Sequence, residues 1–192
     1  MSVENNAEKF RETRIKGLVI VDFPYNLDER GFLQEFYREN EFEFAGHKFT
    51  SPHGALSFSK PGVIRGIHTE EWTKLAIPVT GEMLGAYVDT REDSETFGQV
   101  HTEVFNYSDP DVRHQAVLIP PGVGNSICVT GNQGVMYVYL NSEYWEPDRA
   151  KGVSLFDPDL NIKWPVKNPI VSDRDRNNPT LRELFPHKFG DK

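Results

Sequence analysis

Short apolar or alternating segments of about strand length recur along the chain from Gly17 onward. Most of them are bounded by Gly, Pro, Asp or Asn, which is typical of an antiparallel sandwich or barrel. We expect strands at Leu18–Phe23, Phe32–Phe36, Lys48–Ser51, Ala55–Ser59, Val63–His68, Lys74–Val79, Met83–Asp89, Val100–Phe105, Ala116–Ile119, Ser126–Thr130 and Val135–Asn141.

Helical periodicity is scarce. We expect short helices only at Glu4–Arg14 and at Thr180–Leu184, the second preceded by Pro179. Tight Gly-containing reversals at Thr80–Glu82 and Pro120–Gly122 fit the rhythm of a jelly roll. The sequence therefore predicts an all-β jelly roll with short N- and C-terminal helices. With no linker or repeat, it is one domain over residues 1–192, with tails at 1–16 and 185–192.

Strand alternation predicts which side chains face a cavity inside such a barrel. Val135, Tyr137, Tyr139 and Asn141 share one face of their strand, and this polar and aromatic face is the candidate cavity wall. In the segment 63–68, strict alternation places Arg65 on one face and His68 on the other.

Composition narrows the functional classes. The net charge is −8 and the pI is about 5.3. Because Lys and Arg form no cluster, a nucleic-acid surface is not expected. No apolar run approaches the roughly 18 residues of a membrane span. The N-terminal segment Met1–Gly17 is polar, without the apolar core of a secretion signal, so we expect a cytoplasmic protein. The single cysteine, Cys128, predicts no internal disulfide.

The chemical motifs point to acid–base chemistry. The histidines at positions 47, 53, 68, 101, 114 and 187 lack the His-x-His spacing of metal-binding jelly rolls, so we expect neither a metal nor a cofactor. Serine-nucleophile, nucleotide-hydrolysis and dinucleotide motifs are also absent.

Candidate functional residues lie in three groups: Val63–His68 followed by Trp72–Leu75, then Tyr137, Tyr139 and Trp145, and then Ser172–Asp175. Each stretch taken alone is explained more simply by a hydrogen-bonded core histidine, packed aromatics or a solvated turn.

The order of the motifs along the chain indicates a family, which no single motif does. The chain resembles the dTDP-4-dehydrorhamnose 3,5-epimerase family from about Asp28 to Asp175. The matching pieces are Asp28–Phe32 with Glu35, Gly62–His68, Lys74–Leu75, Gly81–Glu82, Val88–Arg91 with Thr96–Gly98, Ile119–Gly122, Tyr139 with Pro147, Asp157–Leu160 with Ile162–Pro165, and Ile170–Asp175.

The resemblance implies a metal-free, cupin-type jelly roll that forms homodimers by exchanging N-terminal strands. It also implies a nucleotide-sugar epimerase that inverts C3, C5 or both in a 4-keto-6-deoxy sugar. By motif, His68 is similar to the catalytic base, Asp175 to the carboxylate that orients it, Tyr139 to the proton donor and Lys74 to the cation beside the carbonyl. The positions that resemble the family's substrate contacts are Arg30, Glu35, Arg65, Asn125, Trp145 and Arg174, with Arg30 and Glu35 supplied by the partner chain.

Some positions depart from the family pattern. The segment between His68 and Lys74 is shorter, Asn125 replaces a histidine, Trp145 replaces a tyrosine, Ala150 replaces a glutamate, and Ser51–Ser59 lacks a Gln-x-Asn pair. We therefore expect the reaction type to be preserved and leave the nucleotide sugar open. The alternatives are a GDP-linked keto-heptose as substrate and a catalytically silent nucleotide-sugar-binding cupin. A sugar 3,4-ketoisomerase fits the motif set less well.

Overall fold

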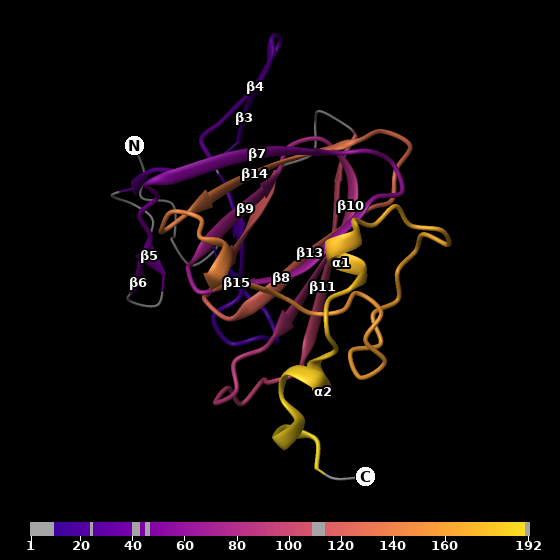
Figure 1. Ribbon diagram of the computed structural model, residues 1–192. Helices are drawn as coiled ribbons and strands as arrows, with labels where there is room; N and C mark the ends of the chain where they lie inside the picture. Colours follow the sequence, from indigo (N-terminus) through magenta and orange to yellow (C-terminus); the bar gives the residue numbers. More distant parts are fainter. Residues whose placement is uncertain (1–9, 24, 40–42, 45–46, 109–113, 191–192) are drawn as a thin grey trace.

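Two antiparallel sheets form the body of the protein (Figure 1). The structure is a computed structural model that describes residues 10–23, 25–39, 43–44, 47–108 and 114–190. The six-stranded sheet has the order β1-β2-β12-β9-β14-β7 and the five-stranded sheet the order β11-β10-β13-β8-β15. Hairpins β3-β4 and β5-β6 form separate two-stranded ribbons.

The six-stranded sheet consists of β1 (Phe10–Glu12), β2 (Val19–Asp22), β12 (Gln115–Ile119), β9 (Lys74–Pro78), β14 (Val135–Asn141) and β7 (His53–Ser59). The five-stranded sheet consists of β11 (Val100–Tyr107), β10 (Gly81–Asp89), β13 (Val123–Val129), β8 (Ile64–Glu70) and β15 (Ala150–Gly152). The ribbons are β3 (Tyr25–Asp28) with β4 (Gly31–Gln34) and β5 (Glu43–Phe44) with β6 (His47–Lys48).

The two α-helices of the described chain lie in its C-terminal part. They are α1 (Asp173–Arg176) and α2 (Leu181–Leu184), and 3-10 turns lie at Pro147–Arg149 and Pro186–Lys188. Thr180 caps α2 and forms a reciprocal capping box with Glu183, as the helix predicted at Thr180–Leu184 requires. No helix in the described ranges is long and apolar enough to span a membrane.

The predicted N-terminal helix at Glu4–Arg14 is wrong where the structure describes it. Phe10–Glu12 forms β1, which pairs with β2 in the register Phe10 to Val21. Hydrogen bonding along the exposed edge of β2 outweighs the weak local helical preference. The first nine residues lie outside the described residues.

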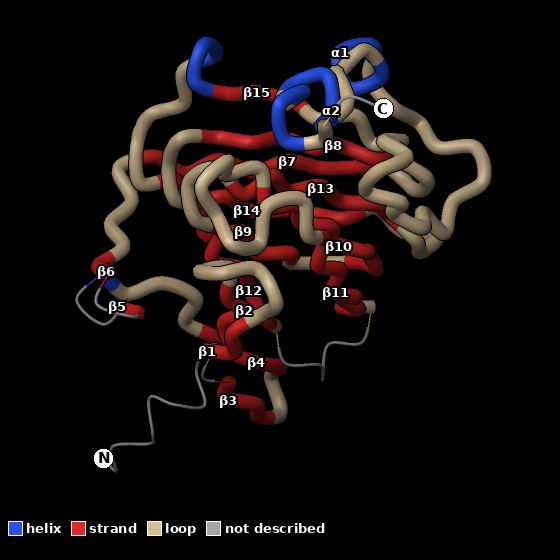
Figure 2. Tube along the Cα trace, turned by 90° about the horizontal axis from the view of Figure 1, so that it is seen from below, coloured by secondary structure: helices blue, strands red, loops and turns tan. Residues whose placement is uncertain are grey.

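Three apolar clusters hold the layers together. One lies between the sheets and includes Ile20, Tyr87 and Tyr137, all fully buried. A second packs on β2, β9 and β12 around Phe23 and Phe49. The third lies under the C-terminal segment, which returns across the five-stranded sheet near α1 and α2 (Figure 2). Strands β9, β12 and β13 are consequently almost entirely buried.

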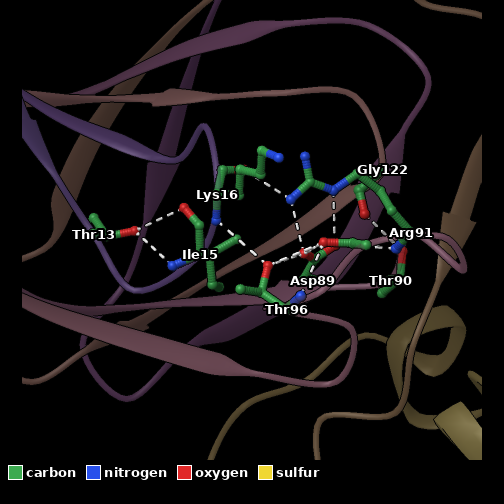
Figure 3. A network of polar contacts seen from close by, with 9 residues as sticks. Thr13, Ile15, Lys16, Asp89, Thr90, Arg91, Thr96 and Gly122 are labelled. Atoms are coloured by element: carbon green, nitrogen blue, oxygen red, sulfur yellow. Dashed lines mark hydrogen bonds and ion pairs between the residues drawn. The ribbon is translucent and has the colours of Figure 1, made fainter.

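A buried polar network ties the segment before β2 to the end of β10 (Figure 3). Asp89 is fully buried and accepts hydrogen bonds from Arg91, Ser94 and Thr96. Arg91 in turn donates to the carbonyl of Lys16 at 2.8 Å. Burial disfavours the ionised carboxylate, but these donors outweigh it and hold the pKa of Asp89 below its ordinary value. The network therefore fixes one end of the sandwich through a buried charge.

Candidate active site

A cavity of about 310 Å³ opens between the two sheets. Strands β7, β9 and β14 of the six-stranded sheet form one wall, and β8 and β13 of the five-stranded sheet form the other. The predicted residues that line the cavity are His68, Lys74, Tyr139, Arg65, Asn125, Asn141 and Trp145. Asp175 stands directly behind His68.

His68 is held by a carboxylate that comes from a distant part of the chain. Its Nε2 lies 2.8 Å from Oδ1 of Asp175, which is 4% exposed. Ser172 caps helix α1 by accepting a hydrogen bond from the backbone N–H of Asp175. Burial disfavours the Asp175 carboxylate, but hydrogen bonds from His68 and the Gly66 N–H outweigh it, so the pKa of Asp175 is lowered. The pair fixes the orientation of the imidazole and leaves Nδ1 to accept a proton.

Gly66 makes this arrangement possible. Its φ of +126° is disfavoured for residues with a side chain, and its N–H donates to Oδ2 of Asp175 at 3.2 Å. A Cβ at this position would lie 2.7 Å from Cβ of Ser126 and 2.8 Å from the carbonyl oxygen of Asn125. Strand β8 can therefore approach β13 and Asp175 only with glycine here.

The simple alternation predicted for residues 63–68 is wrong. Arg65 and His68 both line the cavity, whereas Ile64 and Ile67 are buried in the cluster under the C-terminal segment. The pairing of β8 with β13 shifts register between Asn125 and Ile127, which changes the faces that the side chains reach.

Lys74 is a buried cation at the start of β9. Its Nζ lies 2.5 Å from Oε2 of Glu70, 3.2 Å from Oδ1 of Asn125, and 5.2 Å from the ring centroid of Tyr139. Burial lowers the pKa of Lys74, and the Glu70 carboxylate offsets only part of that effect.

Tyr139 lies on β14, in the sheet opposite His68. Its hydroxyl is 3.1 Å from Oγ of Ser57, and its ring meets that of Tyr137 edge to face at 4.9 Å. Burial raises the pKa of Tyr139, so its hydroxyl stays protonated at neutral pH. The predicted cavity wall from Val135 to Asn141 is confirmed for Tyr139 and Asn141, which line the cavity. Val135 and Tyr137 are instead buried in the apolar cluster between the sheets.

The described chain matches a known family over most of its length. The family model for dTDP-4-dehydrorhamnose 3,5-epimerase matches residues 12–183. The chain belongs to the dTDP-4-dehydrorhamnose 3,5-epimerase family. Members of this family are epimerases, and the cupin-type jelly roll predicted for the chain is their fold.

Individual relatives are similar to this epimerase over most of its length. A protein named RmlC homolog from Streptococcus pyogenes serotype M6 is 35% identical, over 91% of this chain and 89% of its own. A dTDP-4-dehydrorhamnose 3,5-epimerase from Shigella flexneri is 33% identical, over 86% of this chain and 92% of its own. The crystal structure of ChmJ, a 3′-monoepimerase from Streptomyces bikiniensis in complex with dTDP-quinovose, has a TM-score of 0.81 at 32% identity, covering 91% and 89% of the two chains.

Three predicted substrate contacts of the epimerase do not reach the cavity of the same chain. Arg30 pairs with Asp28 in the β3-β4 hairpin, and Glu35 pairs with Arg38. Arg174 is exposed on α1 and lies outside the residues that line the cavity. For Arg30 and Glu35, the family resemblance predicts that they enter the site of a partner chain instead.

Three polar residues of the cavity were not predicted: His53, Ser57 and Glu70. Nδ2 of Asn141 lies 3.3 Å from Nδ1 of His53, and the other contacts are given above. Asn141 was itself predicted, because it ends the cavity-facing alternation from Val135 to Asn141. Glu70 carried no such signal, because the predicted strand ends at His68 and only the structure extends β8 to Glu70. In the described ranges, no three His, Cys, Asp or Glu side chains gather closely enough to hold a metal ion.

Proposed function

We propose that this epimerase inverts C3, C5 or both in a nucleotide diphosphate-linked 4-keto-6-deoxy sugar. The observation that carries the proposal is the convergence of His68 with Asp175, Lys74 and Tyr139 on one cavity. A base, an enolate-stabilising cation and a proton donor are the groups that an epimerisation next to a ketone requires.

His68 is the proposed base. Hydrogens on C3 and C5 are both α to the C4 carbonyl, so removing either one gives the same kind of enolate. Since Nε2 of His68 faces Asp175, Nδ1 takes the proton. The Asp175 carboxylate then stabilises the imidazolium that forms.

Lys74 is the proposed partner of the carbonyl oxygen. Negative charge grows on this oxygen as the C–H bond breaks, and an ammonium in a buried site stabilises it more strongly than water would. Because the interaction strengthens as the charge develops, it lowers the barrier more than it tightens ground-state binding.

Tyr139 is the proposed proton donor for the second half of the reaction. Epimerisation returns a proton to the face opposite the one from which it left. Tyr139 and His68 stand on opposite sheets, and the raised pKa of Tyr139 keeps its proton available. The tyrosinate formed on donation lies beside the Lys74 ammonium.

The proposed substrate is dTDP-4-dehydro-6-deoxyglucose, which carries a diphosphate and a base beyond the sugar. Arg65 is exposed at the cavity and suits phosphate oxygens, and Trp145 offers a ring face that is 49% exposed. A GDP-linked keto-heptose is the second candidate. Two positions that depart from the family pattern, Asn125 and Trp145, line this cavity, where a change of side chain affects which nucleotide sugar fits. The cytoplasmic location predicted from the sequence stays a proposal.

We also propose that two copies complete each other's sites by exchanging N-terminal strands. The β3-β4 hairpin extends away from the sandwich in both views and carries Arg30 (Figures 1 and 2). Leu33 on this hairpin is 75% exposed, and Leu56 and Phe58 are exposed on the edge strand β7. Apolar surface on a hairpin and on a sheet edge is suited to association with another copy.

The catalytic proposal is tested by incubation with dTDP-4-keto-6-deoxyglucose in D2O, with the GDP-linked keto sugar in parallel. We expect deuterium at C3, C5 or both by NMR, and none with His68→Ala. His187→Ala is the matched control, because His187 is exposed, pairs with Glu92 and is not among the residues that line the cavity. Undiminished exchange in His68→Ala would remove His68 from the mechanism. No exchange with any keto sugar would favour the silent binding protein.

The exchange of strands is tested by complementation. Arg30→Ala and His68→Ala are each expected to be inactive, and a mixture refolded together is expected to recover activity in the hybrid dimers. A monomer by light scattering, or no recovery in hybrids of proven dimeric mass, would contradict the proposal.

A further inference from the structure

The cavity contains a carboxylate that the mechanism above does not use. Glu70 is the last residue of β8, and its Oε2 lies 2.5 Å from Nζ of Lys74, the first residue of β9. Their side chains are only 11% and 7% exposed. A buried ion pair costs desolvation energy on both sides, so its presence beside a reacting group calls for a role.

The short connection between the strands holds the two groups face to face. Only residues 71–73 link β8 of one sheet to β9 of the other, and Trp72 among them is 2% exposed. The same segment is the shortened stretch between His68 and Lys74 in the sequence. The chain therefore has little freedom to separate Glu70 from Lys74.

The hydrogen bonds of the Lys74 ammonium leave one of its N–H groups free to point into the cavity. An ammonium has three N–H donors, and here one meets Glu70 and a second meets Oδ1 of Asn125 at 3.2 Å. One donor remains for a substrate. With Lys74 lining the cavity, that donor is available to a carbonyl oxygen bound there.

We propose that Glu70 is a positioning residue that keeps the Lys74 ammonium charged and directs its remaining N–H at the substrate's carbonyl oxygen. The proposal rests on the function proposed above. Burial by itself lowers the pKa of Lys74 and so disfavours its charged form. The adjacent Glu70 carboxylate acts in the other direction and stabilises the ammonium. The charged or titratable groups that face Lys74 in the cavity come from three strands: His53 on β7, Arg65, His68 and Glu70 on β8, and Tyr139 on β14.

The test is the pH dependence of kcat/KM for Glu70→Gln. Glutamine keeps an acceptor oxygen and removes the charge. Activity needs the protonated lysine, so it falls as pH rises through the pKa of Lys74. Removing a contacting opposite charge lowers that pKa, so we expect the basic limb to move down by about one pH unit or more. The activity of Glu70→Gln should recover as the pH is lowered, because Lys74 then regains its proton. A merely structural role of Glu70 would not produce this recovery.

Glu71→Gln is the matched control. Glu71 is the next residue, but its side chain is 55% exposed and pairs with Arg149 rather than Lys74. We expect its pH profile to coincide with that of the wild type. A Glu70→Gln profile that is lowered equally at every pH, with its basic limb unmoved, would overturn the proposal.

Two further measurements keep the test decisive. Competitive acetylation of Lys74, followed by mass spectrometry across the same pH range, needs no substrate and should begin at lower pH in Glu70→Gln. It separates a failure of this inference from a failure of the proposed reaction. If Glu70→Gln does not unfold cooperatively, Glu70→Asp replaces it: a smaller downward shift of the limb supports the role, and an unmoved limb overturns it.

Discussion

The buried carboxylate behind His68 gives the sharpest test of the proposed base. The substitution Asp175→Asn keeps the size and shape of the side chain and removes its charge. Asp175 is 4% exposed and lies 2.8 Å from Nε2 of His68, so no solvent separates the two groups. The wild-type carboxylate is expected to act when His68 becomes positively charged in the transition state.

The size of the effect follows from this contact. A contacting opposite charge stabilises the charged form of its partner by about 1.4 to 4 kcal/mol. The His68 side chain remains 32% exposed, and solvent screens part of that interaction. We therefore take the lower part of the range, about 1.4 to 2.8 kcal/mol, which corresponds to a ~10- to 100-fold lower kcat/KM.

The assay follows deuterium exchange and kcat/KM for the wild type, Asp175→Asn and Asp173→Asn. Asp173 lies on the same single-turn helix and is exposed, so its substitution tests the helix without touching His68. A thermal melt shows whether each variant is folded. Wild-type kcat/KM in folded Asp175→Asn, or an equal loss in Asp173→Asn, would refute the reasoning.

Three further predictions concern the proton donor, the glycine beside the base and the buried network. Tyr139→Phe is expected to slow formation of inverted product by about 100-fold or more, while deuterium exchange at one carbon continues. Equal wild-type and variant rates of inversion, by NMR, would exclude Tyr139. Gly66→Ala should lower the free energy of unfolding by about 2 to 5 kcal/mol, from a disfavoured φ and overpacking against β13. Gly31→Ala is the control for denaturant unfolding, because Gly31 has a φ of +116° and open space around its Cβ position; an equal loss would disprove the clash. Asp89→Asn should cost about 2 to 4 kcal/mol at pH 7. Because the pKa of Asp89 is lowered, its stabilisation is present above the ordinary value of about 3.9 and is lost as pH falls below it. The wild type should therefore lose more stability than Asp89→Asn in acid, and a difference no larger than that given by exposed Asp93→Asn would contradict this.

Local patterns predicted the strands best where a sheet has one polar and one buried face. The alternation from Val135 to Asn141 identified the two cavity residues Tyr139 and Asn141, and the segment Thr180–Leu184 has the capping residues of the helix that it forms. Such features depend on neighbours within a few residues, so they can be read from sequence. The strand Phe10–Glu12 could not be read in this way, because its partner β2 decides its conformation.

In the site, too, some features could be predicted from the sequence and others depend on contacts between distant segments. The motif order predicted that His68, Lys74, Tyr139 and Asp175 act together, although His68 and Asp175 are 107 residues apart in the chain. No local pattern predicted that Arg65 and His68 share a face, because a register shift between β8 and β13 decides it. Glu70 was missed for a related reason: its contact with Lys74 depends on the chain crossing from one sheet to the other.

The sequence by itself determined the all-β class, most strand positions, the family and the residue types for acid–base chemistry. These follow from side-chain periodicity, turn residues and the order of motifs along the chain. Only the tertiary structure decided the distances between groups, the burial of Asp175 and Lys74, and the pairing of Glu70 with Lys74. The physical reason is that charge, solvation and hydrogen bonding depend on contacts between strands, and those contacts exist only after the sheets pack.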